Sequence, residues 1–208
     1  MPQPDRSRSF LAPLICMGVI FLLGGCAAFI PTHDVAVDAI SAPVTGLGTA
    51  YRLTDTDPMA VRNAAQHKLV FASVAAALDT KGIFEAPAGT KQDFNVEVDY
   101  GVNRASVPRM MGMTAMTELF LQLSARRLKP EGVPGKGEEV WNVRVSIMEE
   151  GIDLGTAIPV LAIAAADYVG LDTQTEKKIK VTEKDPRVLH VKSVARAATL
   201  PARAGSGP

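Results

Sequence analysis

The stretch DFNVEVDYGV (residues 93–102) decides the fold class. Apolar side chains occupy every second position from Phe94 to Val102, and Asn95, Glu97 and Asp99 stand between them. This period of two is typical of a β-strand with one face buried and the other in water, as in an antiparallel sheet. The stretch therefore predicts a strand whose apolar face lies against a core.

The same alternation recurs on both sides of this strand. It predicts further strands at 34–40, 48–53, 119–125, 141–147 and 177–183, and a continuation of the last strand, or a hairpin, at 187–194. The segment KPEGVPGKGEE (residues 129–139) is typical of a turn, so 119–125 and 141–147 are expected to form a long antiparallel hairpin.

Two segments have helical spacing instead. The first is predicted over 58–81, with Asp57-Pro58 as its start and Lys81-Gly82 as its stop. The second is predicted over 155–170, with Pro159 in its first turn. Its uninterrupted apolar part is too short to cross a membrane, so we expect a buried helix packed on the sheet.

These elements predict an α+β domain. We expect a two-layer sandwich with a mixed, mostly antiparallel sheet and two helices packed on one face. The length of 208 residues and the apolar content of 47% fit one such domain, which we place at 34–194, with a flexible tail at 195–208. The 22 basic side chains balance 22 acidic ones, which does not favour a nucleic-acid partner.

The N-terminus has the pattern of a secretion signal. Arg6 and Arg8 precede an uncharged apolar run at 10–23, which is short for a permanent membrane span. The following Leu23-Gly24-Gly25-Cys26 resembles the lipobox of bacterial lipoproteins. That resemblance implies a signal peptide at 1–25 and cleavage between Gly25 and Cys26. Cys26 would then carry an S-diacylglyceryl group and an N-acyl chain such as palmitate. The alternative is a plain membrane anchor with an incidental cysteine.

Lipidation sets the expected location of the chain. Two or three acyl chains hold a protein stably on a bilayer, so residues 26–33 would be a lipidated N-terminus and linker. Ala27 stands where some lipoproteins carry an aspartate that retains them at the inner membrane. By that resemblance we expect the outer membrane, with the domain facing the periplasm. Cys16 would be removed with the signal peptide, which leaves Cys26 as the single cysteine and no intramolecular disulfide.

The chain also resembles a family of bacterial envelope lipoproteins known only as a domain of unknown function. The segments that carry the resemblance are GTAYRL, ALDTKGIFEA, DFNVEVDYGV, EEVWNVRV and IPVLAIAAADYVGLDTQTEKKIKVTEKD, which together cover most of the chain after Cys26. The family's middle loop is often rich in tyrosine and serine, and this chain has VPRMMGMTAM (residues 107–116) there. The resemblance implies a fold and an envelope location, and no catalytic residue.

No pattern in the sequence indicates a catalytic or metal site. His33, His67 and His190 are expected in the linker, in the middle of the first helix and in a terminal strand, without metal-ligand spacing. We therefore expect no metal, no cofactor and no enzymatic activity. The alternative is a periplasmic hydrolase, for which Glu149 and Asp153 in the acidic segment 149–153 are the least weak candidates.

Two features are better suited to binding. Met110, Met111 and Met113, with Met116, are expected in or beside a loop, where thioether side chains adapt to apolar partners. Lys178 and Lys180 belong to a basic segment that suits anionic headgroups or an acidic partner. The competing interpretations are core packing for the methionines and a solvated strand face for the lysines. The expected function is a non-catalytic, lipid-anchored envelope lipoprotein that binds an envelope protein or component. A structural subunit of a larger envelope assembly is the other non-catalytic possibility.

Overall fold

The computed structural model describes residues 31–42, 48–56, 63–109, 112–129 and 136–200, with backbone alone at 104–109 and 112–115. These residues belong to a compact unit that begins at Pro31. The signal peptide, Gly25, Cys26, Met110 and Met111 lie outside the described residues. The elements are β1 (Thr32–Ser41), β2 (Ala50–Asp55), α2 (Ala64–Asp79), β3 (Phe84–Glu85), β4 (Phe94–Arg109), β5 (Gly112–Arg127), β6 (Glu139–Glu149), α3 (Leu154–Tyr168), β7 (Lys177–Thr182) and α4 (Pro186–Thr199).

A seven-stranded sheet in the order β3-β2-β4-β5-β6-β1-β7 forms one layer. β2 runs parallel to β3 and to β4, and every other neighbouring pair is antiparallel. The predicted hairpin is present, because Leu119 pairs with Ile147 and Leu123 with Val143 across β5 and β6. The prediction of a mixed, mostly antiparallel sheet is confirmed.

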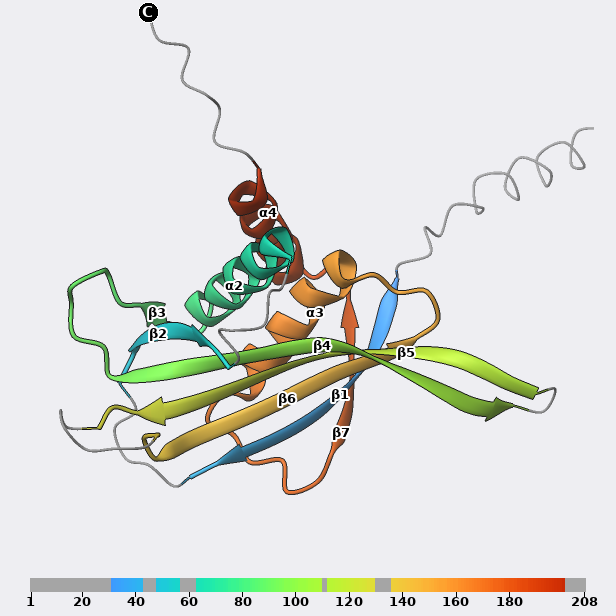
Figure 1. The fold of residues 1–208 in the computed structure, drawn as a ribbon, viewed down its shortest axis with the longest axis horizontal. Helices are drawn as coiled ribbons and strands as arrows, with labels where there is room; N and C mark the ends of the chain where they lie inside the picture. The colour runs from blue at the N-terminus through green and yellow to red at the C-terminus, as the bar shows by residue number, and fades with distance from the viewer. Residues whose placement is uncertain (1–30, 43–47, 57–62, 110–111, 130–135, 201–208) are drawn as a thin grey trace, which may run out of the picture. The chain divides into compact units, whose positions relative to one another are not determined.

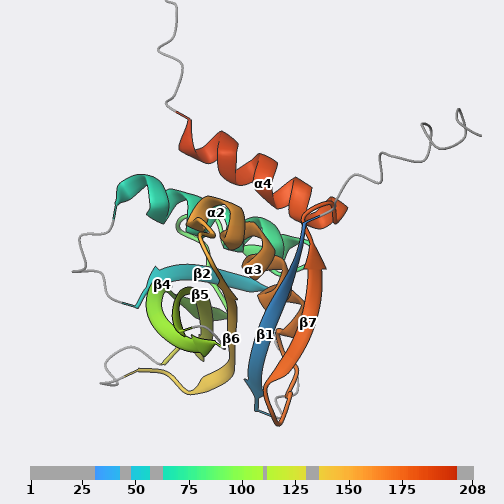
Figure 2. The same ribbon diagram turned by 90° about the vertical axis from the view of Figure 1, so that its right-hand side faces the viewer.

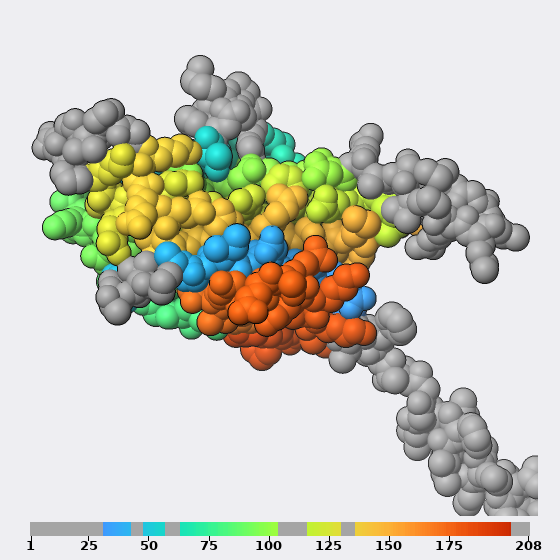
Figure 3. Space-filling model, turned by 90° about the horizontal axis from the view of Figure 1, so that it is seen from below, coloured from blue at the N-terminus to red at the C-terminus, as the bar shows by residue number. Residues whose placement is uncertain are grey.

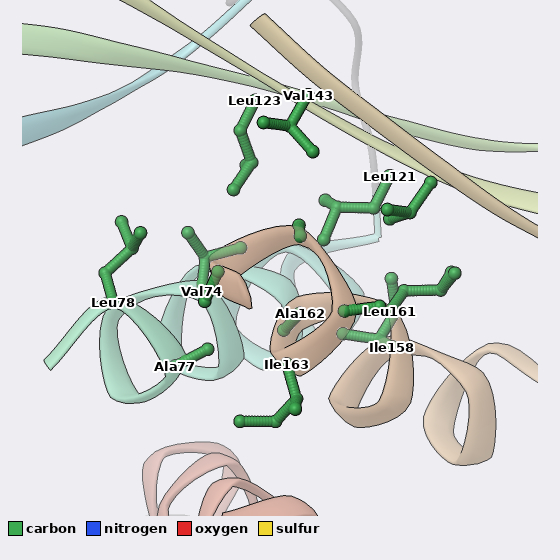
Figure 4. Packing of buried hydrophobic residues seen from close by; sticks show 14 of the residues in the cluster. Val74, Ala77, Leu78, Leu121, Leu123, Val143, Ile158, Leu161, Ala162 and Ile163 are labelled. Carbon is green, nitrogen blue, oxygen red and sulfur yellow. The ribbon is translucent and has the colours of Figure 1, made fainter. Parts of the chain in front are cut away.

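The described helices all cover the same face of the sheet (Figures 1 and 2). α3 lies on β1, β5, β6 and β7, and α2 and α4 pack against it. Every residue of α3 from Ala157 to Ala166 is buried, because the sheet covers one side of the helix and α2 and α4 cover the other. Figure 4 shows Leu121, Leu123 and Val143 pointing from the sheet toward these helices, while Ile163 points away from the sheet toward α4. The α+β sandwich of two layers is confirmed, with three described helices where two were predicted.

The expectation of a strand or hairpin at 187–194 is wrong, because these residues belong to α4. Asp185 caps the helix by accepting a hydrogen bond from the backbone N–H of Arg187, and Pro186 stands in its first turn. The buried side chains Val188, Val191 and Ala195 follow helical spacing. The predicted tail is corrected as well, since α4 continues to Thr199.

Two other boundaries differ from the sequence predictions, and a third prediction lies partly outside the described residues. α2 begins at Ala64 with Asn63 as its N-cap, and the predicted start at Asp57-Pro58 lies outside the described residues. The expected glycine stop is present at Gly82, where φ is +73°. Pro159 is the sixth residue of α3 and so lies beyond its first turn. β1 begins at Thr32, so the domain includes His33, which was assigned to the linker.

Candidate binding surface

The face of the sheet opposite the helices carries no helix among the described residues (Figure 3). Its side chains come from the solvent-facing positions of each strand, which alternate with the buried ones. Figure 3 shows β1 in blue between the orange β7 and the yellow β6 on this open face. The open face is therefore assembled from strands that are far apart in the sequence and adjacent in the sheet.

A groove of about 500 Å³ lies on the open face. It is lined by Asp34, Ala36, Glu118, Ser146, Met148, Glu176 and Lys178, which come from β1, β5, β6, β7 and the segment before β7. Three carboxylates face one ammonium group, and the Met148 side chain is 48% exposed. The groove therefore combines an acidic lining with an exposed thioether, which suits a partner that has basic and apolar side chains.

The groove is connected to an aromatic contact on β5. The Arg144 guanidinium lies 4.3 Å from the centre of the Phe120 ring, and its Nη2 is 3.6 Å from Glu118 Oε1. Gly101 on β4 gives the ring its space, because a Cβ at that position would lie 2.8 Å from Phe120 Cε1. These contacts fix Glu118 at the edge of the groove.

A smaller hollow of about 210 Å³ lies near the other end of the sheet, where β4 begins. Its one acidic lining residue, Glu97, has an oxygen 3.2 Å from Arg126 Nε and another 2.9 Å from Lys136 Nζ. The carboxylate is therefore already neutralised by two cations of the same chain. In the groove on the open face, Arg144 likewise lies beside Glu118, and Lys180 Nζ is 4.0 Å from Asp34 Oδ1. The groove is the better candidate for a binding site because it is larger and three of its lining residues are acidic.

Glu149 and Asp153, the candidates for a hydrolase, have separate structural roles. Glu149 Oε1 lies 2.8 Å from Nδ1 of His33. Asp153 is the N-cap of α3 and accepts hydrogen bonds from the backbone N–H and the hydroxyl of Thr156, of which the hydroxyl bond contributes most to lowering the pKa of the Asp153 carboxyl. Glu149 thus contacts His33 on the neighbouring strand, and Asp153 caps a helix.

His33 is the centre of a polar cluster between β1, β6 and α4. Its ring is buried, and its Nε2 lies 3.2 Å from Glu183 Oε1, on the opposite side from Glu149. Lys192 on α4 donates to Glu183 over 2.5 Å. The hydrogen bond from Lys192, and after it that from His33, lowers the pKa of the Glu183 carboxyl. Because both ring nitrogens face carboxylate oxygens, the cluster connects the first strand to the last helix.

The other predicted site residues are spread over the domain. His67 is in the first turns of α2, stacked on Phe71, and His190 is on α4. Among the described residues, no group of three His, Cys, Asp or Glu side chains is arranged to hold a metal ion. None of the described helices has the length and apolar character needed to cross a membrane.

The binding residues suggested by the sequence are partly reassigned. Met113 and Met116 belong to β5, and Met113 is one residue from the last pair of the hairpin, Arg109 with Gly112. Lys178 and Lys180 lie exposed on β7, and Lys178 lines the groove. Lysines on an edge strand also oppose pairing with other strands, which supports the interpretation as a solvated strand face for Lys180.

Sequence reasoning missed the acidic part of the groove. Asp34, Glu118 and Glu176 are separated by more than fifty residues along the chain. The sequence did contain one signal. Asp34 and Lys178 alternate with apolar residues and therefore fall on the polar side of predicted strands. What was missing is the strand order, which brings β5, β6, β1 and β7 together.

No family model matches this chain, and no curated protein matches it. Several solved structures are similar to the chain at low sequence identity, among them the following three. A PDZ domain protein from Parabacteroides distasonis is 12% identical with a TM-score of 0.48, over 82% of this chain and 43% of that one. A PelC dodecamer from Paraburkholderia phytofirmans is 11% identical with a TM-score of 0.42, over 66% and 98%. A minor lipoprotein from Acinetobacter baumannii is 11% identical with a TM-score of 0.34, over 63% and 98%. The chain thus spans less than half of the first of these proteins.

Proposed function

We propose that the chain is a lipid-anchored lipoprotein of the bacterial envelope whose domain binds an envelope protein through the groove on its open face. The signal pattern and the lipobox-like Leu23-Gly24-Gly25-Cys26 support the anchor. Ala27 supports an outer-membrane location with the domain in the periplasm. The role is binding without catalysis.

The observation that carries the binding role is the open face itself. Helices cover one face of the sheet, while the other presents a groove with Asp34, Glu118 and Glu176 around Met148. Side chains that only keep a sheet soluble need no concave arrangement. A groove with an acidic rim and an apolar contact favours a partner segment that carries lysine or arginine beside an aliphatic side chain.

Titration with two peptides of opposite charge tests this role. The first alternates arginine and leucine, and the second alternates glutamate and leucine. We expect the basic peptide to shift the amide resonances of Ala36, Ser146 and Met148, and the acidic peptide to leave them unchanged. Because exposed ion pairs contribute about 0.2–1 kcal/mol each, every neutralised carboxylate should weaken binding by up to about fivefold.

The matched variants are Asp34→Asn with Glu176→Gln in the groove, and Asp99→Asn with Glu138→Gln outside its lining. Only the first pair should weaken binding of the basic peptide. Equal binding of both peptides, or equal losses in both pairs of variants, would contradict the groove as the binding site.

A further inference from the structure

The outer face of α4 carries an exposed stripe. The helix packs against α2 and α3, and it buries Val188, Val191 and Ala195 there. Four exposed residues at helical spacing lie on the opposite side, which points away from the sheet (Figure 2). We call them the outer stripe: Leu189, Ser193, Arg196 and, at the C-cap, Leu200.

The outer stripe is apolar and lies in a basic segment. Its two leucines are 51% and 63% exposed, and it contains no carboxylate. Residues 184–200 contain four basic side chains and one acidic side chain, Asp185. Arg187 and Lys192 are paired with carboxylates of the domain, whereas Lys184 and Arg196 have no ion pair within the described part of the chain. Exposed leucines beside such cations are typical of a helix that lies in the interface of an anionic membrane.

The chain enters the domain beside the start of α4. The backbone N–H of Glu183 donates to the carbonyl oxygen of Pro31 over 3.1 Å, and α4 begins three residues later, at Pro186. The side chain of Glu183 also faces His33 on β1. The start of α4 is therefore held next to Pro31, the residue at which the described chain begins (Figure 2).

A lipid on Cys26 would hold a bilayer near this point. Cys26 is five residues before Pro31, and five residues span at most about 18 Å. The 14 residues of α4 extend over about 21 Å. A tether this short gives the bilayer a millimolar effective concentration at α4, so a weak contact is sufficient. The contact requires no particular extension of the linker, because the linker joins the domain at the start of α4.

We propose that the outer stripe of α4 is a second membrane contact, which rests on the headgroups of an anionic phospholipid bilayer while the lipid on Cys26 holds the chain. This inference rests on the proposed lipid anchor. The leucines enter the boundary between headgroups and acyl chains, and Lys184 and Arg196 attract the phosphates. Because α4 and the open face are on opposite sides of the domain, the contact turns the groove away from the bilayer, toward its partner.

The test replaces the lipid by a tether that does not depend on processing. The chain from Ala27 to Pro208, which contains no cysteine, carries an N-terminal hexahistidine tag and is bound to vesicles of phosphatidylglycerol and a nickel-chelating lipid. A fluorescent probe is attached at Ser193→Cys on the outer stripe or at Met148→Cys in the groove. Met148 lines the groove together with Asp34, close to the start of β1 but on the opposite face. Brominated lipids then quench a probe that touches the bilayer.

We expect quenching at position 193 and none at position 148. Each unpaired cation near an anionic surface contributes about fivefold. Lys184→Gln with Arg196→Gln should therefore lower the ratio of membrane-bound to free α4 roughly 25-fold. The matched pair Lys91→Gln with Arg127→Gln, which removes the same charge where β4 begins, should leave the ratio unchanged. Replacing phosphatidylglycerol by phosphatidylcholine should act like the loss of Lys184 and Arg196.

A leucine pair separates the apolar part of the contact. Leu189 and Leu171 are both 51% exposed. Leu171 is two residues from Thr173, whose backbone N–H bonds to Ala39 near the other end of β1. Leu189→Ser should lower the ratio of membrane-bound to free α4 about fivefold, because the exposed half of the leucine is buried in lipid. Leu171→Ser should leave the ratio unchanged.

The proposal is overturned if the probe at 193 is not quenched, if the probes at 193 and 148 are quenched equally, or if the control substitutions act like those in α4. It is also overturned if the tagged chain, without vesicles, forms a dimer that Leu189→Ser abolishes, because a second copy would then cover the outer stripe. Since the tag supplies the tether, these outcomes do not depend on lipidation of Cys26, which is tested separately by mass.

Discussion

Polar side chains make two different sets of contacts, one on each face of the sheet. On the helix side, Glu183 accepts hydrogen bonds from Lys192 and faces His33, and these contacts connect β1 with α4. On the open face, Arg144 covers the ring of Phe120 and reaches toward Glu118. The contacts of Glu183 stabilise the fold near the N-terminal end of the domain. The contacts of Arg144 border the groove.

The lowered pKa of Glu183 predicts how stability depends on pH. Lys192 and His33 stabilise the ionised carboxylate in the folded state, so the folded pKa lies below the unfolded one. The contribution is complete above the ordinary glutamate range and is lost as the pH falls through the lowered folded pKa. Denaturant unfolding of Glu183→Gln should show a loss of about 1 kcal/mol at pH 7 that shrinks toward pH 3. A loss that grows on acidification, or an equal loss in the exposed control Glu176→Gln, would contradict this assignment.

The contact between Arg144 and Phe120 predicts a coupling energy. A guanidinium over a partly exposed aromatic ring contributes about 0.5–1 kcal/mol. A double-mutant cycle with Phe120→Leu and Arg144→Gln, measured by chemical denaturation, should give a coupling of that size. Independent, additive effects of the two substitutions would show that the contact does not contribute to stability.

At the scale of elements, α4 connects the end of the described chain to the other two described helices. α4 packs against α2 and α3, and at its start Arg187 donates to Asp167 near the end of α3 over 2.8 Å. Lys81, just after α2, lies 2.6 Å from the same carboxylate. One aspartate therefore joins the three described helices at their ends.

The helical packing of α4 predicts unequal effects for neighbouring residues. Val191 is fully buried, whereas Leu189 is 51% exposed. In a strand, both side chains would lie on one face and would have similar effects. We expect Val191→Ala to lower the free energy of unfolding by about 1–2 kcal/mol and Leu189→Ala by less than about 0.5 kcal/mol. Similar losses at both positions would contradict the helix.

Hydrogen exchange tests the independence of the end of the β4–β5 hairpin. Residues 105–109 and 112–116 pair with each other beyond Thr117, the last residue of β5 that pairs with β6. An isolated pair of strands is only marginally stable in water. The amides of this hairpin end should therefore exchange much faster than those of 119–125, which lie between β4 and β6. Equal protection in both parts of β5 would mean that another surface covers the hairpin end in solution.

Strong local patterns explain which elements the sequence predicts. The alternation in 93–102 and 141–147 and the apolar spacing of 155–170 mark a buried face by themselves, and β4, β6 and α3 are present. In 187–194 the spacing of Val188, Val191 and Ala195 competes with an apparent alternation of Leu189 and Val191. The start signal Asp185-Pro186 decides for a helix. The groove could not be predicted, because its residues meet only through the strand order.

At the scale of the whole molecule, β1 would link the proposed lipid anchor to the proposed binding surface. This strand is paired on both sides, with β6 and with β7, and it contributes Asp34 and Ala36 to the groove. A lipid on Cys26 would thus be joined by a linker of a few residues to the strand that lines the groove. In the proposed arrangement, this short linker keeps the groove close to the membrane that holds the lipid.

The most direct test of this account is the intact mass and membrane fractionation of the chain, compared with Cys26→Ala, in a bacterium that processes lipoproteins. The account predicts loss of residues 1–25, a gain of diacylglyceryl and acyl mass on Cys26, and release of the variant from its membrane fraction. An unprocessed chain without added lipid, which stays in the membrane with or without Cys26, would contradict the account and would assign the apolar run at 10–23 to a membrane anchor.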